Sequence, residues 1–88
     1  MPLVSIIMPY YKKESYLEQS INSILNQTYQ NFEIILINDD IENKNFINKF
    51  SKLDSRIKLV HNKNNLGAGL SRNRGVKLSN GEYIAFCD

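Results

Sequence analysis

Polar and aromatic side chains gather at the predicted carboxyl ends of four short apolar segments. They are Pro9-Tyr10-Tyr11, Asn38-Asp39-Asp40, the loop 61–65 and Asp88. An aromatic ring can stack on a nucleotide base, and a carboxylate can accept hydrogen bonds from base N–H groups or ribose hydroxyls. Carboxylates also ligate Mg²⁺ and Mn²⁺, which bridge readily to phosphates. These residue types therefore indicate a nucleotide site with a divalent cation.

The hydrophobic pattern predicts a scaffold that brings these segment ends together. Nearly continuous apolar runs, typical of buried strands, occur at residues 4–8, 32–37 and 82–88, and a shorter, half-polar run at 57–60 is typical of a strand nearer an edge. Apolar residues at helical spacing predict helices at about 15–26, 44–53 and 66–78. The order β-α-β-α-β-α-β predicts an open, doubly wound, mostly parallel α/β sheet, which binds ligands beyond the carboxyl ends of its strands.

Two local patterns refine this prediction. Ser15 followed by Glu18 has the spacing of a capping box and predicts the start of the first helix. Gly67, Ser71 and Gly75 lie four residues apart and would give the third helix a stripe of small residues. Such a stripe would let the helix sit close to the sheet.

Composition bounds the class of protein and its partners. The 88 residues are 42% hydrophobic and 23% charged, and a net charge of +2 is too small to indicate nucleic acid or an anionic membrane as a partner. No apolar run approaches the roughly 18–20 residues of a transmembrane helix. The single cysteine, Cys87, excludes an internal disulfide. We expect a cytoplasmic protein.

The sequence lacks the defining motifs of three classes of nucleotide-binding or signalling protein. The loop after the first strand contains no glycine, so it cannot wrap a pyrophosphate as a dinucleotide-binding loop does. Gly67-Ala68-Gly69 begins like that fingerprint, but Arg72 occupies the third glycine position. No Gly-Lys-Ser/Thr phosphate loop is present, and the acidic pair follows the second strand, whereas a response regulator carries it after the first.

Four segments in order resemble the family 2 glycosyltransferases, enzymes of the GT-A fold. Residues 4–11 are similar to the family's opening strand and Pro-Thr-Tyr-Asn loop, and residues 23–35 to its helix end and second strand. The run Asn65-x-Gly67-x-x-x-Ser71-Arg72-Asn73-x-Gly75 matches Asn-x-Gly-x-x-x-Ala-Arg-Asn-x-Gly. Residues 81–88 resemble the strand that leads into the metal-binding Asp-x-Asp. The resemblance covers essentially the whole chain and implies the Rossmann-like N-terminal half of a GT-A domain.

The resemblance implies roles for five residues. Tyr11 would stack near the uracil of a nucleotide sugar, with the Pro9 backbone lining the same pocket. Asp39 would hydrogen-bond the uracil edge. Arg72 would hold the base region or the diphosphate, which suits a planar, permanently charged side chain. Asp88 would be the first Asp of Asp-x-Asp, near the ribose and the metal.

Other polar residues of the rim have ordinary explanations. His61 has no partner at metal-ligand spacing, so a structural role is expected, and Arg74 is expected on the solvated surface. Tyr10 stands where the family has a small Thr, which would narrow the pocket or change the base preference.

The implied enzyme transfers a sugar from a nucleotide-diphosphate sugar, expected to be UDP-linked, with the help of Mg²⁺ or Mn²⁺. An acceptor hydroxyl on a saccharide or lipid-linked molecule would attack with inversion, in bacterial surface-polysaccharide synthesis, at or near the inner face of the membrane. The sequence would stop at the metal motif, so the catalytic base would lie beyond it. We then expect no turnover by the 88 residues alone, and self-association through exposed apolar surface. Two alternatives stay open: a non-catalytic nucleotide-binding module, and an α/β scaffold that keeps the pattern for packing only.

Overall fold

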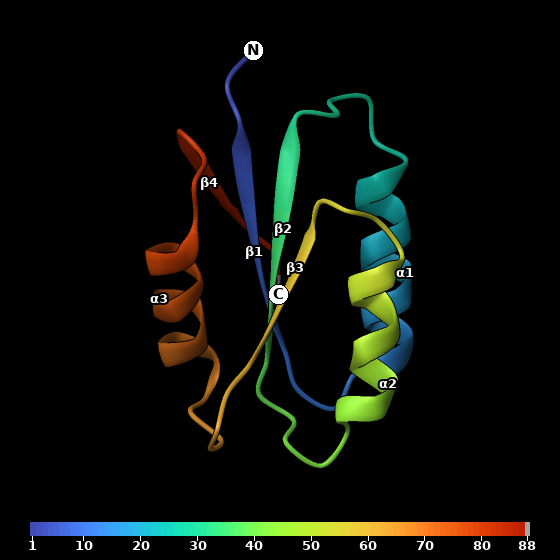
Figure 1. The fold of residues 1–88 in the computed structure, drawn as a ribbon, viewed down its shortest axis with the longest axis vertical. Helices are drawn as coiled ribbons and strands as arrows, with labels where there is room; N and C mark the ends of the chain where they lie inside the picture. The colour runs from blue at the N-terminus through green and yellow to red at the C-terminus, as the bar shows by residue number, and fades with distance from the viewer. Residues whose placement is uncertain (88) are drawn as a thin grey trace.

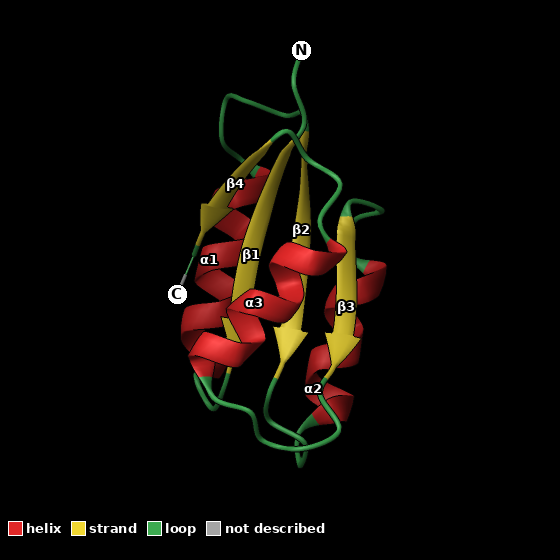
Figure 2. Cartoon of the chain, turned by 90° about the vertical axis from the view of Figure 1, so that its left-hand side faces the viewer, coloured by secondary structure: helices red, strands yellow, loops and turns green. Residues whose placement is uncertain are grey.

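The computed structural model describes residues 1–87 (Figure 1). Its elements are β1 (Val4–Tyr10), α1 (Glu14–Leu25), β2 (Phe32–Asn38), α2 (Lys44–Asn48), the 3₁₀ helix η1 (Lys49–Lys52), β3 (Ile57–His61), α3 (Ala68–Leu78) and β4 (Tyr83–Phe86). The strands form one sheet in the order β3-β2-β1-β4, with every pairing parallel. Helices α1 and α2 cover one face and α3 the other (Figures 1 and 2). The predicted doubly wound α/β fold is confirmed. Within the described residues, each helix is too short or too polar to cross a membrane.

Alternating side chains of the central strands divide the core into two layers. The layer under α1 and α2 includes Ile6, Met8, Leu17, Ile21, Ile34, Leu36 and Ile47. The layer under α3 includes Ile7, Ile35, Ile37 and Val60. Because both faces are covered, β2 is buried along its whole length, which explains its uninterrupted apolar sequence.

Helix α1 begins at Glu14, two residues earlier than a cap at Ser15 would place it. The backbone N–H of Leu17 already donates to the carbonyl oxygen of Lys13 at 2.9 Å, and no side chain caps the helix. Lys12 has φ 52°, so the chain reverses its direction before Ser15. The predicted capping box at Ser15 is therefore wrong, because the turn after β1 sets the first helical residue.

Helix α3 lies close to the sheet through two of the three predicted small residues. Ser71 and Gly75 are fully or almost fully buried, and a Cβ atom added to Gly75 would lie 2.5 Å from Ile7 Cγ2. The third, Gly67, precedes the helix, which begins at Ala68. Its φ of 86° lies in the left-handed region that favours glycine, and it turns the chain into the helix.

Strand β4 is an exposed edge of the sheet. Its side chains were expected to be buried, but Tyr83 is 61% and Phe86 55% exposed. The expectation is wrong because α3 packs over β1 and β2, leaving β4 paired with β1 alone in the described part of the chain. The opposite edge is β3, as its half-polar sequence predicts.

Candidate functional site

A cavity of about 480 Å³ opens at the carboxyl end of β1. Its walls are the β1–α1 loop, the start of α1, the end of β2 and the start of α3. Four of the five predicted site residues, Pro9, Tyr11, Asp39 and Arg72, line this one cavity. The fifth, Asp88, lies outside the described residues.

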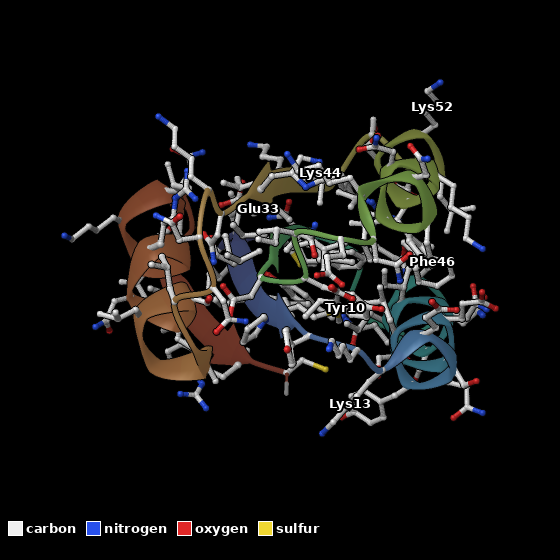
Figure 3. All side chains as sticks on the ribbon, turned by 90° about the horizontal axis from the view of Figure 1, so that it is seen from below. Tyr10, Lys13, Glu33, Lys44, Phe46 and Lys52 are labelled. Atoms are coloured by element: carbon white, nitrogen blue, oxygen red, sulfur yellow. The ribbon has the colours of Figure 1, made fainter. Side chains whose placement is uncertain are left out.

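The two tyrosines after the opening strand have different surroundings. Tyr11 is 46% exposed, and the Lys12 Nζ atom lies 5.2 Å from its ring centroid. Tyr10 is only 3% exposed, and its ring centroid lies 6.3 Å from that of Phe46 (Figure 3). Tyr10 therefore borders the cavity as part of the core, whereas Tyr11 presents a ring on which a base could stack.

The carboxylate of Asp39 is buried and accepts three hydrogen bonds. Its Oδ1 accepts from Asn62 Nδ2 at 2.9 Å and from the Leu66 N–H at 2.7 Å, and its Oδ2 accepts from the Gly67 N–H at 2.9 Å. Burial raises the pKa of Asp39, but the hydrogen bonds from Leu66, Asn62 and Gly67 together lower it by a larger amount. The pKa of Asp39 therefore lies below its ordinary value. An ionised carboxylate has about four accepting positions, so one more donor can be accommodated.

Asp39 also joins three parts of the rim through its backbone. Its N–H donates to the carbonyl oxygen of Tyr10 at 2.9 Å, and its carbonyl accepts from Asn65 Nδ2 at 3.3 Å. Together with the bonds to Leu66 and Gly67, these contacts fix the end of β1, the end of β2 and the loop before α3 relative to one another. The sequence indicated a ligand-binding role for Asp39 and missed this structural one.

A buried polar network behind Asp39 was also missed. The Asn62 side chain donates through Nδ2 to both Asp39 Oδ1 and Ser71 Oγ, each at 2.9 Å, and its Oδ1 accepts from Arg74 Nη1 at 2.6 Å. Arg74 also donates to the His61 carbonyl oxygen at 3.1 Å, so it links α3 to β3, contrary to the expected solvated role. The available signal was the position of Asn62, which directly follows the third strand on the predicted rim.

Positive charge reaches the cavity from two sides. Arg72 lies one turn into α3, and Lys13 lies at the start of α1, and both line the cavity. A guanidinium and an ammonium group are suited to bind an anionic ligand such as a diphosphate. Lys13 was not among the predicted site residues.

The described residues do not fit a metal ion on their own. Among residues 1–87, no group of three or more His, Cys, Asp and Glu side chains could hold one. The carboxylate of Asp39, which lines the cavity, already accepts three hydrogen bonds from N–H donors. The predicted ligand, Asp88, lies outside the described part of the chain.

His61 occupies a structural position beside the rim. Asn38 Oδ1 accepts from the Asp40 N–H, so the Asn38 amide donates to His61 Nδ1 at 2.9 Å. The other ring nitrogen, Nε2, then donates to Asn48 Oδ1 at 3.0 Å. Burial, and secondly the charge of Lys44, lower the pKa of His61, which favours this neutral form.

Comparison with known proteins identifies relatives along the whole chain. The family model described as "Glycosyl transferase family 2" matches residues 5–88. An uncharacterized glycosyltransferase of Haemophilus influenzae is 48% identical over 90 residues, which cover 100% of this chain and 36% of the relative. WfgD of Escherichia coli, a UDP-Glc:alpha-D-GlcNAc-diphosphoundecaprenol beta-1,3-glucosyltransferase, is 43% identical over 86 residues, which cover 98% of this chain and 34% of WfgD. The chain thus spans about a third of the length of these relatives.

Solved structures share the fold. Residues 1–349 of S. aureus TarS in complex with UDP-GlcNAc superimpose with a TM-score of 0.84 at 27% identity, over 100% of this chain and 26% of that one. The mannosyltransferase PcManGT from Pyrobaculum calidifontis, in complex with GDP-Man and Mn²⁺, gives a TM-score of 0.82 at 18% identity, over 94% and 26%. At that identity the second likeness shows the fold alone.

Proposed function

Because this chain belongs to glycosyl transferase family 2, we propose that it forms the donor site of a glycosyltransferase that uses a UDP-linked sugar. The enzyme transfers the sugar to an acceptor hydroxyl with inversion at the anomeric carbon. The chain itself supplies recognition of the nucleotide. Family membership confirms the resemblance noted in the sequence.

The observation that carries the proposal is the cavity at the carboxyl end of β1. Pro9, Tyr11, Asp39 and Arg72 come from three separate segments, yet all line this cavity of about 480 Å³. A scaffold kept only for packing does not require an exposed ring, a carboxylate and a guanidinium around one opening. The alternative of a pure α/β scaffold is therefore less well supported than a nucleotide site.

The chemistry of these groups favours uracil over cytosine as the base. The Tyr11 ring offers a stacking surface, and the remaining accepting position of Asp39 suits a base that presents a ring N–H. Uracil and guanine present such an N–H, whereas cytosine presents an unprotonated ring nitrogen that a carboxylate repels. The UDP-GlcNAc bound to TarS supports the same donor class. Arg72 would then bind the diphosphate.

A divalent cation, Mg²⁺ or Mn²⁺, is part of the proposal, and the Mn²⁺ in the PcManGT complex supports it. When bound, such an ion neutralises charge on the leaving diphosphate. Residues 1–87 do not hold it, so Asp88 is its proposed ligand in this chain. The contribution of the described residues is to bind and orient the nucleotide.

The acceptor and the cellular setting complete the proposal. The acceptor is a saccharide or a lipid-linked saccharide in bacterial surface-polysaccharide synthesis, as the diphosphoundecaprenol-linked substrate named for WfgD supports. We propose that the enzyme acts in the cytoplasm at the inner face of the membrane, where such an acceptor would be used. We assign no catalytic base to this chain and expect it to bind nucleotide without turnover. At high concentration, copies associate through the exposed apolar edge at β4, which size-exclusion chromatography over a concentration series measures.

Titration of the ¹⁵N-labelled chain with UDP and Mg²⁺ tests the proposal. We expect saturable shifts of the amides of Tyr11, Asp39 and Arg72, and weaker binding of CDP, which differs from UDP only in its base. Asp39→Asn should weaken UDP binding, because it replaces one acceptor oxygen by a donor. Absence of shifts at millimolar UDP would contradict the donor site and favour the scaffold.

A further inference from the structure

Asn62 lies at the centre of the polar network behind the cavity. It is 1% exposed, and its backbone N–H donates to the Asn38 carbonyl oxygen at 2.9 Å. Both hydrogens of its amide are used, one by Asp39 Oδ1 and one by Ser71 Oγ, and its amide oxygen accepts from Arg74. Every polar atom of this buried side chain therefore has a partner.

Two opposite charges fix the orientation of the Asn62 amide. Its nitrogen faces the Asp39 carboxylate, and its oxygen faces the Arg74 guanidinium at 2.6 Å. Rotating the amide by half a turn would place oxygen against carboxylate and N–H against guanidinium, which is unfavourable at both ends. The amide thus transmits the position of Arg74 on α3 to the carboxylate at the end of β2.

We propose that Asn62 is a positioning residue for nucleotide binding: it holds the Asp39 carboxylate in the orientation that leaves an accepting position toward the cavity. This inference rests on the proposed function and extends it to a residue that does not line the cavity. Arg74 contributes by holding Asn62. Without the amide, the carboxylate would keep only the backbone donors of Leu66 and Gly67, which are adjacent in the loop before α3, and could rotate toward them.

A second buried network of this chain shows what a purely structural role would look like. Ser5 Oγ donates to Glu33 Oε2 at 2.6 Å, near the amino ends of β1 and β2 and away from the cavity. Ser5 is 0% exposed and, like Asn62, supports a buried carboxylate. Ser5→Ala is therefore a matched control, because it removes a comparable bond without touching the rim.

The experiment compares Asn62→Ala, Arg74→Met and Ser5→Ala with the wild-type chain. Three quantities are measured: the dissociation constant for UDP with Mg²⁺ at pH 7, the pKa of Asp39 from its ¹³Cγ shift, and the free energy of unfolding in urea. Arg72 and Lys13, which line the cavity, and the neighbouring Asp40 are unchanged in every variant. Arg74→Met removes one positive charge behind Asn62. Arg74→Met retains the Asn62 side chain but removes the guanidinium that holds it, so it covers the case in which Asn62→Ala does not fold.

We expect Asn62→Ala to weaken UDP binding roughly tenfold, the effect of losing one charge-assisted hydrogen bond, and to raise the pKa of Asp39. Arg74→Met should shift both quantities in the same direction by a smaller amount. Ser5→Ala should lower stability and leave both unchanged. If the Asn62 and Arg74 variants keep wild-type UDP affinity and Asp39 pKa, Asn62 is not a positioning residue. If the wild-type chain fails to bind UDP, both the proposed function and the role of Asn62 in nucleotide binding are contradicted. The UDP titration makes this distinction, because the pKa of Asp39 could still change in the variants of a chain that does not bind UDP.

Discussion

Gly75 of α3 and Ile7 of β1 are so close that no side chain fits between them. A Cβ atom on Gly75 would lie 2.5 Å from Ile7 Cγ2, and Ile7 is 0% exposed. This contact brings α3 close to the sheet. At this short distance between helix and sheet, the backbone N–H groups of Leu66 and Gly67, just before the helix, reach the Asp39 carboxylate.

Gly75→Ala should destabilise the fold by about 1–3 kcal/mol, the usual cost of overpacking a core. The added methyl group must displace Ile7 or lift α3, and this outweighs the gain of about 1 kcal/mol from the better helix propensity of alanine. Urea unfolding followed by circular dichroism measures the change. Gly69→Ala is the control on the same helix, because a Cβ atom there meets no atom within 4 Å apart from its chain neighbours and the backbone of its own helix. Equal stability of the two variants would contradict the close contact.

Arg72→Ala should weaken UDP binding roughly tenfold, because the diphosphate loses a charge-assisted hydrogen bond. The loss should be smaller for uridine, which has no phosphate, and calorimetry with both ligands measures it. Lys77→Ala removes the same charge from an exposed position on α3. If Lys77→Ala weakens UDP binding as much, net charge rather than a contact with Arg72 explains the effect.

Glu33→Gln should lower stability at pH 7 by about 3 kcal/mol. Burial raises the pKa of Glu33, but hydrogen bonds from Lys58, Ser5 and the Asn80 N–H outweigh it and lower the pKa to about 2, from an ordinary value of 4.5. Between these values the unfolded chain binds the proton and the folded chain does not. The stabilisation is therefore complete above pH 4.5 and is lost as the pH falls toward 2.

Urea unfolding at pH 7, 4 and 3 tests this dependence, and the difference between Glu33→Gln and wild type should shrink as the pH falls. Asp54→Asn is the comparison, because the pKa of Asp54 is also lowered to about 2, chiefly by Arg56, but this ion pair lies near the surface. We expect a smaller loss for Asp54→Asn, since solvent screens exposed pairs. If the difference in stability between Glu33→Gln and wild type does not change with pH, the negative charge of Glu33 does not stabilise the fold.

Stability should also fall as the pH drops below the ordinary pKa of His61, 6.5. Burial lowers the pKa of His61 in the folded chain, so the unfolded chain binds the proton first and is favoured at lower pH. Protonation would in addition place a second N–H at Nδ1, facing the donating amide of Asn38. His61→Gln should remove this component between pH 7.5 and 5.5. An unchanged pH profile in that variant would assign the effect to another group.

Much of the candidate site could be predicted from short patterns. Pro9, Tyr11 and Asp39 were placed on one rim because parallel strands with helical crossovers bring their carboxyl ends to the same edge. Arg72, which lies on a helix, was added by the resemblance to the family 2 glycosyltransferases. The structure brings these four together around a single cavity. Their roles toward a nucleotide remain predictions, as does that of Asp88.

The failures have a common origin in contacts between distant segments. The apolar residues of β4 indicate a buried strand, but whether a helix covers them depends on where α3 packs. Arg74 looks like any charged residue on a helix until β3 places Asn62 and the His61 carbonyl beside it. Neither spacing nor residue type contains that information.

By itself, the sequence determined the order of helices and strands, the two-faced burial of the central strands and the set of residues at the rim. It could do so because hydrophobic periodicity and strand-end position are local properties. Only the tertiary structure decided that Asp39 is held by Asn62, Leu66 and Gly67, and that β4 stays exposed. The bonds from Leu66 and Gly67 depend on how closely α3 approaches the sheet, which the contact between Gly75 and Ile7 sets. The exposure of β4 depends on which strands α3 covers, namely β1 and β2.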